Sequence, residues 1–90
     1  MDSDNTHTTH ADIIKRLNRA SGHLKSVTQM IQDGRPCLDI AQQMHAVEKA
    51  IQQAKRILVH DHIDHCLEAA LDDDSPHQAL DDFKSITRYL

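Results

Sequence analysis

The chain has 90 residues, of which 27% are charged and only 2% aromatic, and its formal net charge is −4. This length suffices for one small domain, residues 1–90, whose core is marginal without a partner or a metal. So few aromatic rings argue against modules that read single-stranded nucleic acid by base stacking. No apolar run approaches the roughly 18–20 residues of a membrane span, and no signal-peptide pattern occurs, so a cytoplasmic protein is expected.

Two glycines, two prolines and no alternating β-branched runs predict an all-α fold with three helices. Residues 1–8 are polar and are expected to be a flexible N-terminal segment. The first helix is expected over residues 10–33, with Thr9 as a possible N-cap and Asp12 three residues on. Its predicted apolar stripe consists of Ile14, Leu17, Ser21, Leu24, Thr28 and Ile31.

A turn is predicted between the first and second helices. Gly34 suits the left-handed position after a helix, and Pro36 suits the first turn of the next one. The second helix is expected over residues 36–70 and is ended by the acidic run 72–74, whose charges repel one another beside a negative helix end. A capping box at residues 75–78 precedes a short third helix, expected over 76–89. The stripe of that helix consists of Ala79, Phe83, Ile86 and Leu90.

The second helix carries apolar residues at intervals of four and three over about three heptads, which predicts packing against another helix. This seam consists of Ile40, Met44, Val47, Ile51, Ala54 and Leu58. A monomer would leave the seam exposed, so we expect an antiparallel helical-bundle dimer and, further, a dimer of dimers.

Cys37, His62 and Cys66 form the main candidate metal site. His62 and Cys66 are one helical turn apart and can chelate together. The 25 positions from Cys37 to His62 would span roughly 37 Å of continuous helix, whereas the ligands of one metal lie about 3–4 Å apart. Cys37 can therefore join the other two only in trans, in an antiparallel pair with two equivalent sites. Alternatively, the cysteines are small core residues, or they form an intermolecular disulfide.

Charge is distributed unevenly along the chain. Residues 13–60 carry eight basic groups against three acidic ones, while residues 61–90 carry eight acidic groups against two basic ones. The basic half predicts a surface that contacts phosphates. A solvated helix face is the alternative interpretation. The candidate DNA-binding residues are Lys15, Arg16, Arg19, Lys25 and Lys49.

Three segments resemble the family of copper-sensitive operon repressors and nickel/cobalt repressors: residues 16–23 (RLNRASGH), 35–37 (RPC) and 60–66 (HDHIDHC). The resemblance implies an all-α dimer, usually paired into a tetramer, that binds operator DNA when metal-free and releases it when metal binds. It also implies that Cys37 of one protomer and His62 and Cys66 of the other are the ligands.

The same family contains formaldehyde and persulfide sensors. Formaldehyde-sensing relatives have a proline after the initiator Met, where this chain has Asp2. Persulfide-sensing relatives lack the histidine that is present here as His62. The resemblance therefore favours a metal as the effector.

The choice of metal depends on a possible fourth ligand. Two thiolates and one imidazole suit Cu(I), and an added nitrogen would suit Ni(II) or Co(II). Nickel- and cobalt-sensing relatives have an N-terminal histidine whose ungapped equivalent here is Asn5; His7 follows two residues later, and His10 is a second candidate. Copper sensors often have Tyr where this chain has Pro36. We expect Ni(II) or Co(II), with Cu(I) as the alternative.

No catalytic arrangement is recognisable, so an enzyme is not expected. The main rival to a repressor is a cytoplasmic metal carrier that has the same ligands but does not bind DNA. The basic first helix favours the repressor, because a carrier has no need of it.

Overall fold

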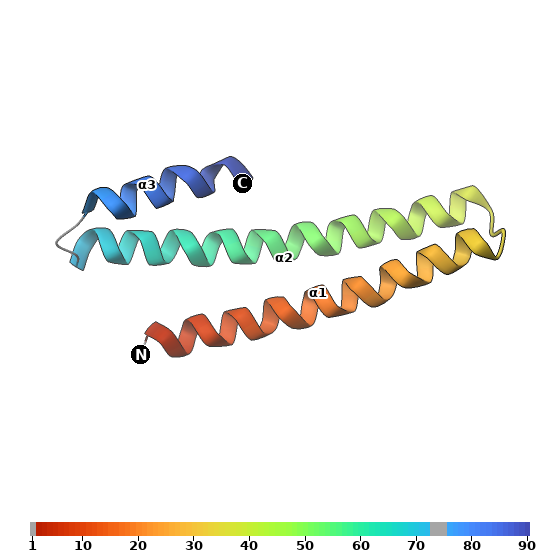
Figure 1. The fold of residues 1–90 in the computed structure, drawn as a ribbon, viewed down its shortest axis with the longest axis horizontal. Helices are drawn as coiled ribbons and strands as arrows, with labels where there is room; N and C mark the ends of the chain where they lie inside the picture. Colours follow the sequence, from red (N-terminus) through yellow and green to blue (C-terminus); the bar gives the residue numbers. More distant parts are fainter. Residues whose placement is uncertain (1, 73–75) are drawn as a thin grey trace.

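The computed structural model describes the backbone of residues 2–72 and 76–90, and the side chains of residues 9–68, 71 and 77–90. The described residues form three α-helices and a short 3-10 helix, which confirms the all-α prediction. The helices are α1 (Asp2–Gln32), α2 (Cys37–Asp72) and α3 (Pro76–Ile86), followed by η1 (Thr87–Tyr89). Figure 1 shows α1 and α2 as an antiparallel hairpin, with α3 folded back along the other side of α2.

The helix bounds differ from the predicted ones mainly at the N-terminus. α1 begins at Asp2 instead of residue 10, so the helix includes most of the segment expected to be flexible. The sequence there contains no Gly or Pro, and acidic residues near a helix N-terminus interact favourably with the helix dipole. α3 ends at Ile86 and continues as 3-10 helix to Tyr89. The predicted acidic break and its cap at Ser75 lie outside the described residues.

The turn between α1 and α2 has the predicted form. Gly34 has a φ of 70°, in the left-handed region that glycine adopts without strain. The Arg35 N–H donates to the Met30 carbonyl at 3.0 Å, which is the long bond of a Schellman motif. The Ile40 N–H donates to the Pro36 carbonyl at 3.1 Å and begins the hydrogen-bonding of α2. This turn reverses the chain and places α1 beside α2.

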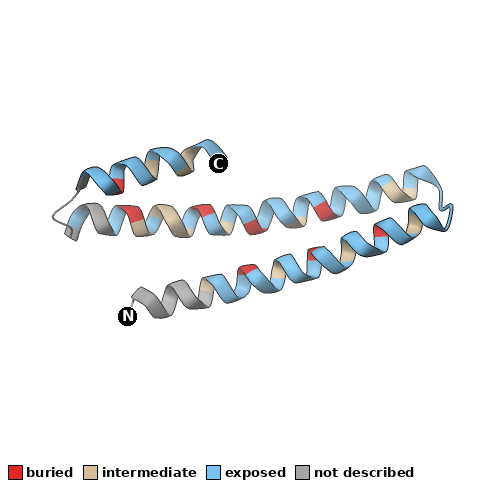
Figure 2. Ribbon diagram, viewed as in Figure 1, coloured by how far each residue is buried: buried red, intermediate tan, exposed pale blue. Residues whose placement is uncertain are grey.

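The three helices lie in one layer. The molecule measures 59 × 26 × 13 Å, and its smallest dimension is close to the roughly 10–12 Å diameter of a single helix with its side chains. Because a core normally lies between two layers, the protomer buries few described side chains (Figure 2): Ile13, Ala20, Val27, Val47, Ala54, Val59, Cys66 and Ala79. No helix within the described residues is both long and apolar enough to cross a membrane.

The stripe predicted for α1 does not pack against α2. The buried residues of α1 are Ile13, Ala20 and Val27, spaced by seven. Ile14, Leu17, Leu24 and Ile31 of the predicted stripe remain 43–58% exposed. The stripe containing Ala20 allows the two helices to approach closely, because alanine adds little side chain at the contact. α1 therefore has a second apolar stripe that is not buried by the described residues of the protomer.

The seam predicted for α2 is divided between two faces. Val47 and Ala54 are buried. They lie on the same face of α2 as Gln43, which contacts His23 of α1. Met44, Ile51 and Leu58 are 43–45% exposed and follow one another at intervals of seven. These last three residues, called the exposed seam below, form the part of the predicted surface that is available to a second molecule.

Candidate metal centre

Cys37 and the pair His62–Cys66 lie far apart in the protomer. Cys37 is the first residue of α2, which continues without a break to Asp72. At 1.5 Å per residue, the rise from Cys37 to His62 is about 37 Å. Within the described part of one protomer, no three His, Cys, Asp or Glu side chains are grouped so as to hold a metal. The continuous helix assumed in the trans arrangement is therefore present.

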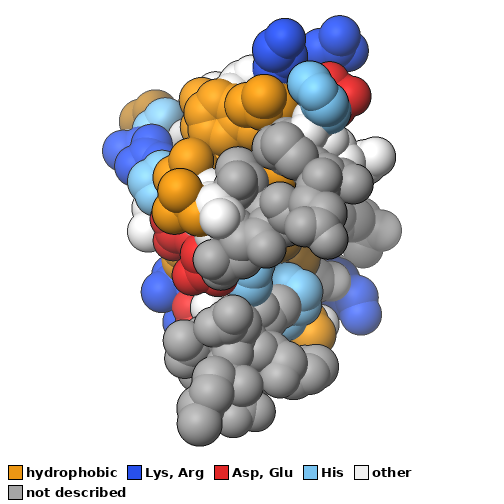
Figure 3. Space-filling model, turned by 90° about the vertical axis from the view of Figure 1, so that its left-hand side faces the viewer, with side chains coloured by type: hydrophobic (Ala, Val, Ile, Leu, Met, Phe, Trp, Pro, Cys, Tyr) orange, Lys and Arg blue, Asp and Glu red, His pale blue; other side chains and the backbone are white. Residues whose placement is uncertain are grey.

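α3 covers the face of α2 that carries His62 and Cys66. Cys66 is only 6% exposed, whereas Cys37 is exposed. His62 is half-buried and lines a groove of about 260 Å³ between α2 and the C-terminal helices. The other residues that line this groove are Asp82, Ser85, Ile86 and Tyr89. Figure 3 views this end of the molecule and shows histidine side chains on its surface beside hydrophobic ones.

Asp82 is a neighbour of the site that the sequence reasoning missed. Burial raises the pKa of the Cys66 thiol above its ordinary value, and the negative charge of Asp82 raises it further. Since a metal binds the thiolate, binding must displace this proton. The sequence predicted an amphipathic third helix, in which Asp82 lies three positions after Ala79. That Asp82 lies near Cys66 depends on tertiary packing and could not be predicted from this pattern.

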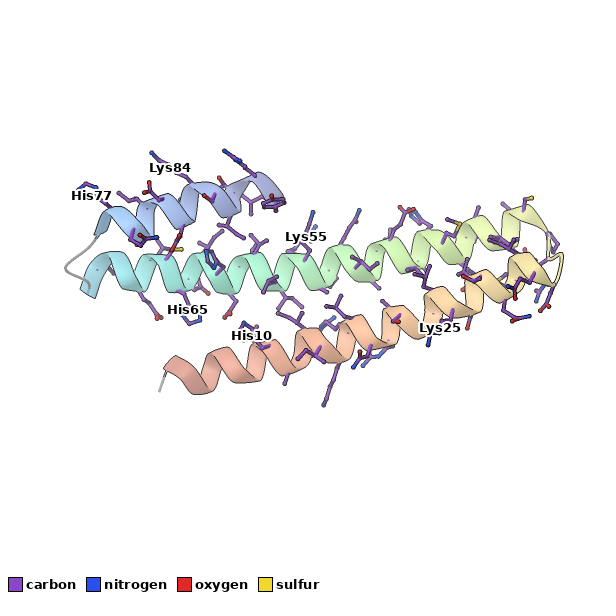
Figure 4. The ribbon with its side chains drawn as sticks, viewed as in Figure 1. His10, Lys25, Lys55, His65, His77 and Lys84 are labelled. Atoms are coloured by element: carbon purple, nitrogen blue, oxygen red, sulfur yellow. The ribbon has the colours of Figure 1, made fainter. Side chains whose placement is uncertain are left out.

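The two candidates for a fourth ligand differ in what the structure shows. The side chain of His7 lies outside the described residues. His10 Nε2 is 3.8 Å from Asp61 Oδ2, and His65 Nε2 is 3.7 Å from the same oxygen. Figure 4 shows His10 and His65 facing each other between α1 and α2, on the opposite side of α2 from α3. Within one protomer, His10 is therefore apart from the groove that His62 lines.

The His10–Asp61–His65 contact was not expected from the sequence. The Asp61 side chain is 17% exposed, and it joins the two histidines across the α1–α2 interface. The His65 side chain is 37% exposed and lies at the contact between the two helices. The signal available in the sequence was the spacing of Asp61 and His65 by four residues, one helical turn.

Three of the five predicted DNA-binding residues lie together. Arg16, Arg19 and Lys49 line a groove of about 640 Å³ between α1 and α2, called the basic groove below. Arg16 Nε–H also donates to Asp12 Oδ2 at 2.9 Å. Lys15 and Lys25 are exposed on α1 and do not line this groove.

His23, to which the sequence reasoning assigned no role, also lines the basic groove. Its Nε2 lies 2.6 Å from Gln43 Oε1, so the ring bridges α1 and α2. No sequence signal reveals this bridge, because the two residues are 20 positions apart on different helices.

The proposed ligands fit a thiophilic transition metal. Two cysteine thiols and an imidazole form a set of soft and borderline donors that suits Cu(I), Ni(II) or Co(II) better than Mg²⁺ or Ca²⁺. The half-buried His62 and the buried Cys66 occupy the same face of α2, one turn apart. Cys37 is exposed, so its thiol is accessible to a second molecule.

Comparisons with known proteins identify the family of this chain. Residues 9–89 match the family model of the metal-sensitive transcriptional repressors. The chain is 34% identical over 80 residues to the copper-sensing transcriptional repressor CsoR of Bacillus subtilis, covering 84% of this chain and 79% of that protein. It is 29% identical over 76 residues to CsoR of Mycobacterium ulcerans, covering 84% of this chain but only 65% of that longer relative.

One solved structure is closely similar. The nickel-responsive transcriptional regulator InrS superposes with a TM-score of 0.80 and 31% sequence identity, covering 89% of this chain and 91% of its own. The similarity thus extends to proteins named for copper and for nickel. The match over nearly the whole chain shows that this protein belongs to the metal-sensitive transcriptional repressor family.

Proposed function

We propose that this protein is a metal-responsive transcriptional repressor that binds operator DNA when metal-free and releases it on binding Ni(II) or Co(II). The observation that carries the proposal is the separation of Cys37 from His62 and Cys66 along one unbroken helix. A complete site then requires a second molecule, so metal binding reports on the geometry of an assembly. Such a site suits a sensor that must change how its protomers present a DNA-binding surface.

The exposed seam supports an antiparallel dimer. Met44, Ile51 and Leu58 form an apolar line that begins one heptad after Cys37 and ends four residues before His62. When two copies pair antiparallel along this line, Cys37 of each lies beside the His62–Cys66 end of the other, and two-fold symmetry gives two equal sites. The second exposed stripe, on α1, can support further pairing into a tetramer.

In the dimer, Cys37 of one protomer and His62 and Cys66 of the other would bind the metal, with His7 as the proposed fourth ligand. A nitrogen from His7 would complete a four-coordinate set for Ni(II) or Co(II), whereas three ligands suffice for Cu(I). Eight histidines, two of them within the first ten residues, favour nickel or cobalt. Cu(I) is the alternative, and the copper-sensing relatives give it equal support.

DNA binding is proposed for the basic groove and the exposed bases of α1. Arg16, Arg19 and Lys49 surround the groove, and Lys15 and Lys25 extend the positive charge along α1. If metal binding recruits the segment that carries His7, α1 changes position and its bases lose phosphate contacts. Reciprocity then requires DNA to weaken metal binding by the same factor.

The decisive experiment is a gel-shift titration with the DNA upstream of the chain's own gene, with and without metal. Tight binding by the metal-free protein and release by Ni(II), Co(II) or Cu(I) is expected. The strength of each metal as a releasing agent identifies the effector. Equal affinity of the metal-free and metal-loaded protein would leave the metal carrier as the better interpretation.

A further inference from the structure

His23 lines the basic groove but has no role in the proposed function. Its ring is half-buried between α1 and α2, and its Nε2 is 2.6 Å from Gln43 Oε1. Since an amide oxygen only accepts hydrogen bonds, Nε2 carries the proton in this contact. In the neutral ring Nδ1 then bears a lone pair, while in the protonated ring it becomes a second N–H donor.

The groove around His23 is suited to an anion. Its charged lining residues are Arg16 and Arg19 from α1 and Lys49 from α2, and no carboxylate is among the described residues that line it. Asp12 pairs with Arg16 through the guanidinium Nε, which leaves the two terminal nitrogens of that group for another acceptor.

Gly22 leaves the wall of this groove open. A Cβ atom built on Gly22 would meet nothing within 4 Å, and the residue has no positive φ. Glycine in the middle of a helix destabilises it relative to alanine, and no contact in the described protomer explains its presence. Close approach of a ligand to the backbone at this point would explain it.

We propose that the basic groove seats a phosphate of the DNA backbone against Gly22 and His23, and that His23 donates Nδ1–H to this phosphate when protonated. The inference rests on the proposed function and adds a phosphate-binding residue to it. Because Gln43 holds Nε2–H, a neutral ring would direct its Nδ1 lone pair toward the anion, which is unfavourable. DNA binding therefore takes up a proton at His23.

The test measures the affinity of the metal-free full chain for the DNA upstream of its gene by fluorescence anisotropy, at constant ionic strength. Between about pH 8 and about pH 6, where histidine ordinarily titrates, the affinity of the wild type should rise about threefold to tenfold. His23→Gln can keep the contact with Gln43 but cannot gain a charge, so its affinity should change much less. The matched control His45→Gln, exposed on α2 and absent from the groove, should behave as the wild type.

Two further measurements distinguish the loss of a phosphate contact from misfolding of a variant. In the wild type, NMR should show the His23 ring titrating at higher pH with DNA than without it. Gly22→Ala should keep or raise thermal stability but weaken DNA binding. A wild-type pH dependence that persists unchanged in His23→Gln, or unaltered DNA binding by Gly22→Ala, would overturn this inference alone. An absence of DNA binding at every pH would instead overturn the proposed function.

Discussion

The two ends of the α1–α2 hairpin differ in charge, burial and chemistry. The half that includes the turn carries the basic groove and the exposed Cys37. The opposite end carries the acidic residues of 61–90, the buried Cys66 and the His10–Asp61–His65 contact. The first end is suited to phosphate and the second to a metal. α2 joins the two ends without a break, so in the proposed antiparallel dimer the Cys37 of one copy would lie at the candidate metal-binding end of the other.

The largest expected effect is the loss of metal affinity when one of the proposed ligands is removed. Cys37→Ala, His62→Ala and Cys66→Ala should each weaken metal binding about 100-fold or more, because each removes one of only three or four ligands. The helices should remain formed by circular dichroism. Competition with a chromophoric chelator measures the affinity.

A mixed dimer sharpens this test. Pairing Cys37→Ala with His62→Ala subunits should give one intact site and one site with two ligands missing. Two equally strong sites in that heterodimer would contradict the trans arrangement.

The second expected effect concerns the exposed seam. Ile51→Glu places a charge in the proposed dimer contact and should weaken association about 30-fold or more, as expected for an interface hot spot. Analytical ultracentrifugation should detect the monomer. The control Leu71→Glu changes a leucine that is 86% exposed and lies beyond the seam, and it should leave the assembly intact. A wild type that sediments as a stable folded monomer would contradict both the dimer and the shared metal site.

The third effect concerns the basic groove. Arg19→Ala should weaken DNA binding about fivefold to tenfold and reduce the slope of log affinity against log salt by about 1. Metal affinity should stay the same, because Arg19 lies at a distance from the proposed ligands. Lys84→Ala on α3 (Figure 4) is the matched control. A loss of metal binding in Arg19→Ala would show that the two regions are not separate.

The smallest effect concerns the Cys66 thiol. Asp82→Asn removes the negative charge that opposes thiolate formation, so the pKa of Cys66 should fall. Burial, the larger cause, remains, and the pKa should stay above its ordinary value. Ultraviolet absorbance of the thiolate during a pH titration in the Cys37→Ala background measures the shift. Ser85→Ala, which changes an uncharged residue of the same groove, should leave the pKa as it is.

The sequence by itself determined the features that depend on local rules. Gly34 and Pro36 fix the turn, because one adopts a positive φ and the other suits a helix start. The spacing of Cys37, His62 and Cys66 converts directly into distance once the helix is continuous, since its rise per residue is constant. These rules gave the all-α fold, the hairpin and the separation of the proposed ligands.

Only the tertiary structure decided which faces of these helices meet. Ile13 and Ile14 begin two adjacent apolar stripes, and only the residues of the first, which includes the small Ala20, are buried. The same choice of rotation brought His23 to Gln43, while the return of α3 placed Asp82 near Cys66. Periodicity shows that a helix has an apolar face, but the rotation and approach of each helix are set by the close packing of side chains from distant parts of the chain.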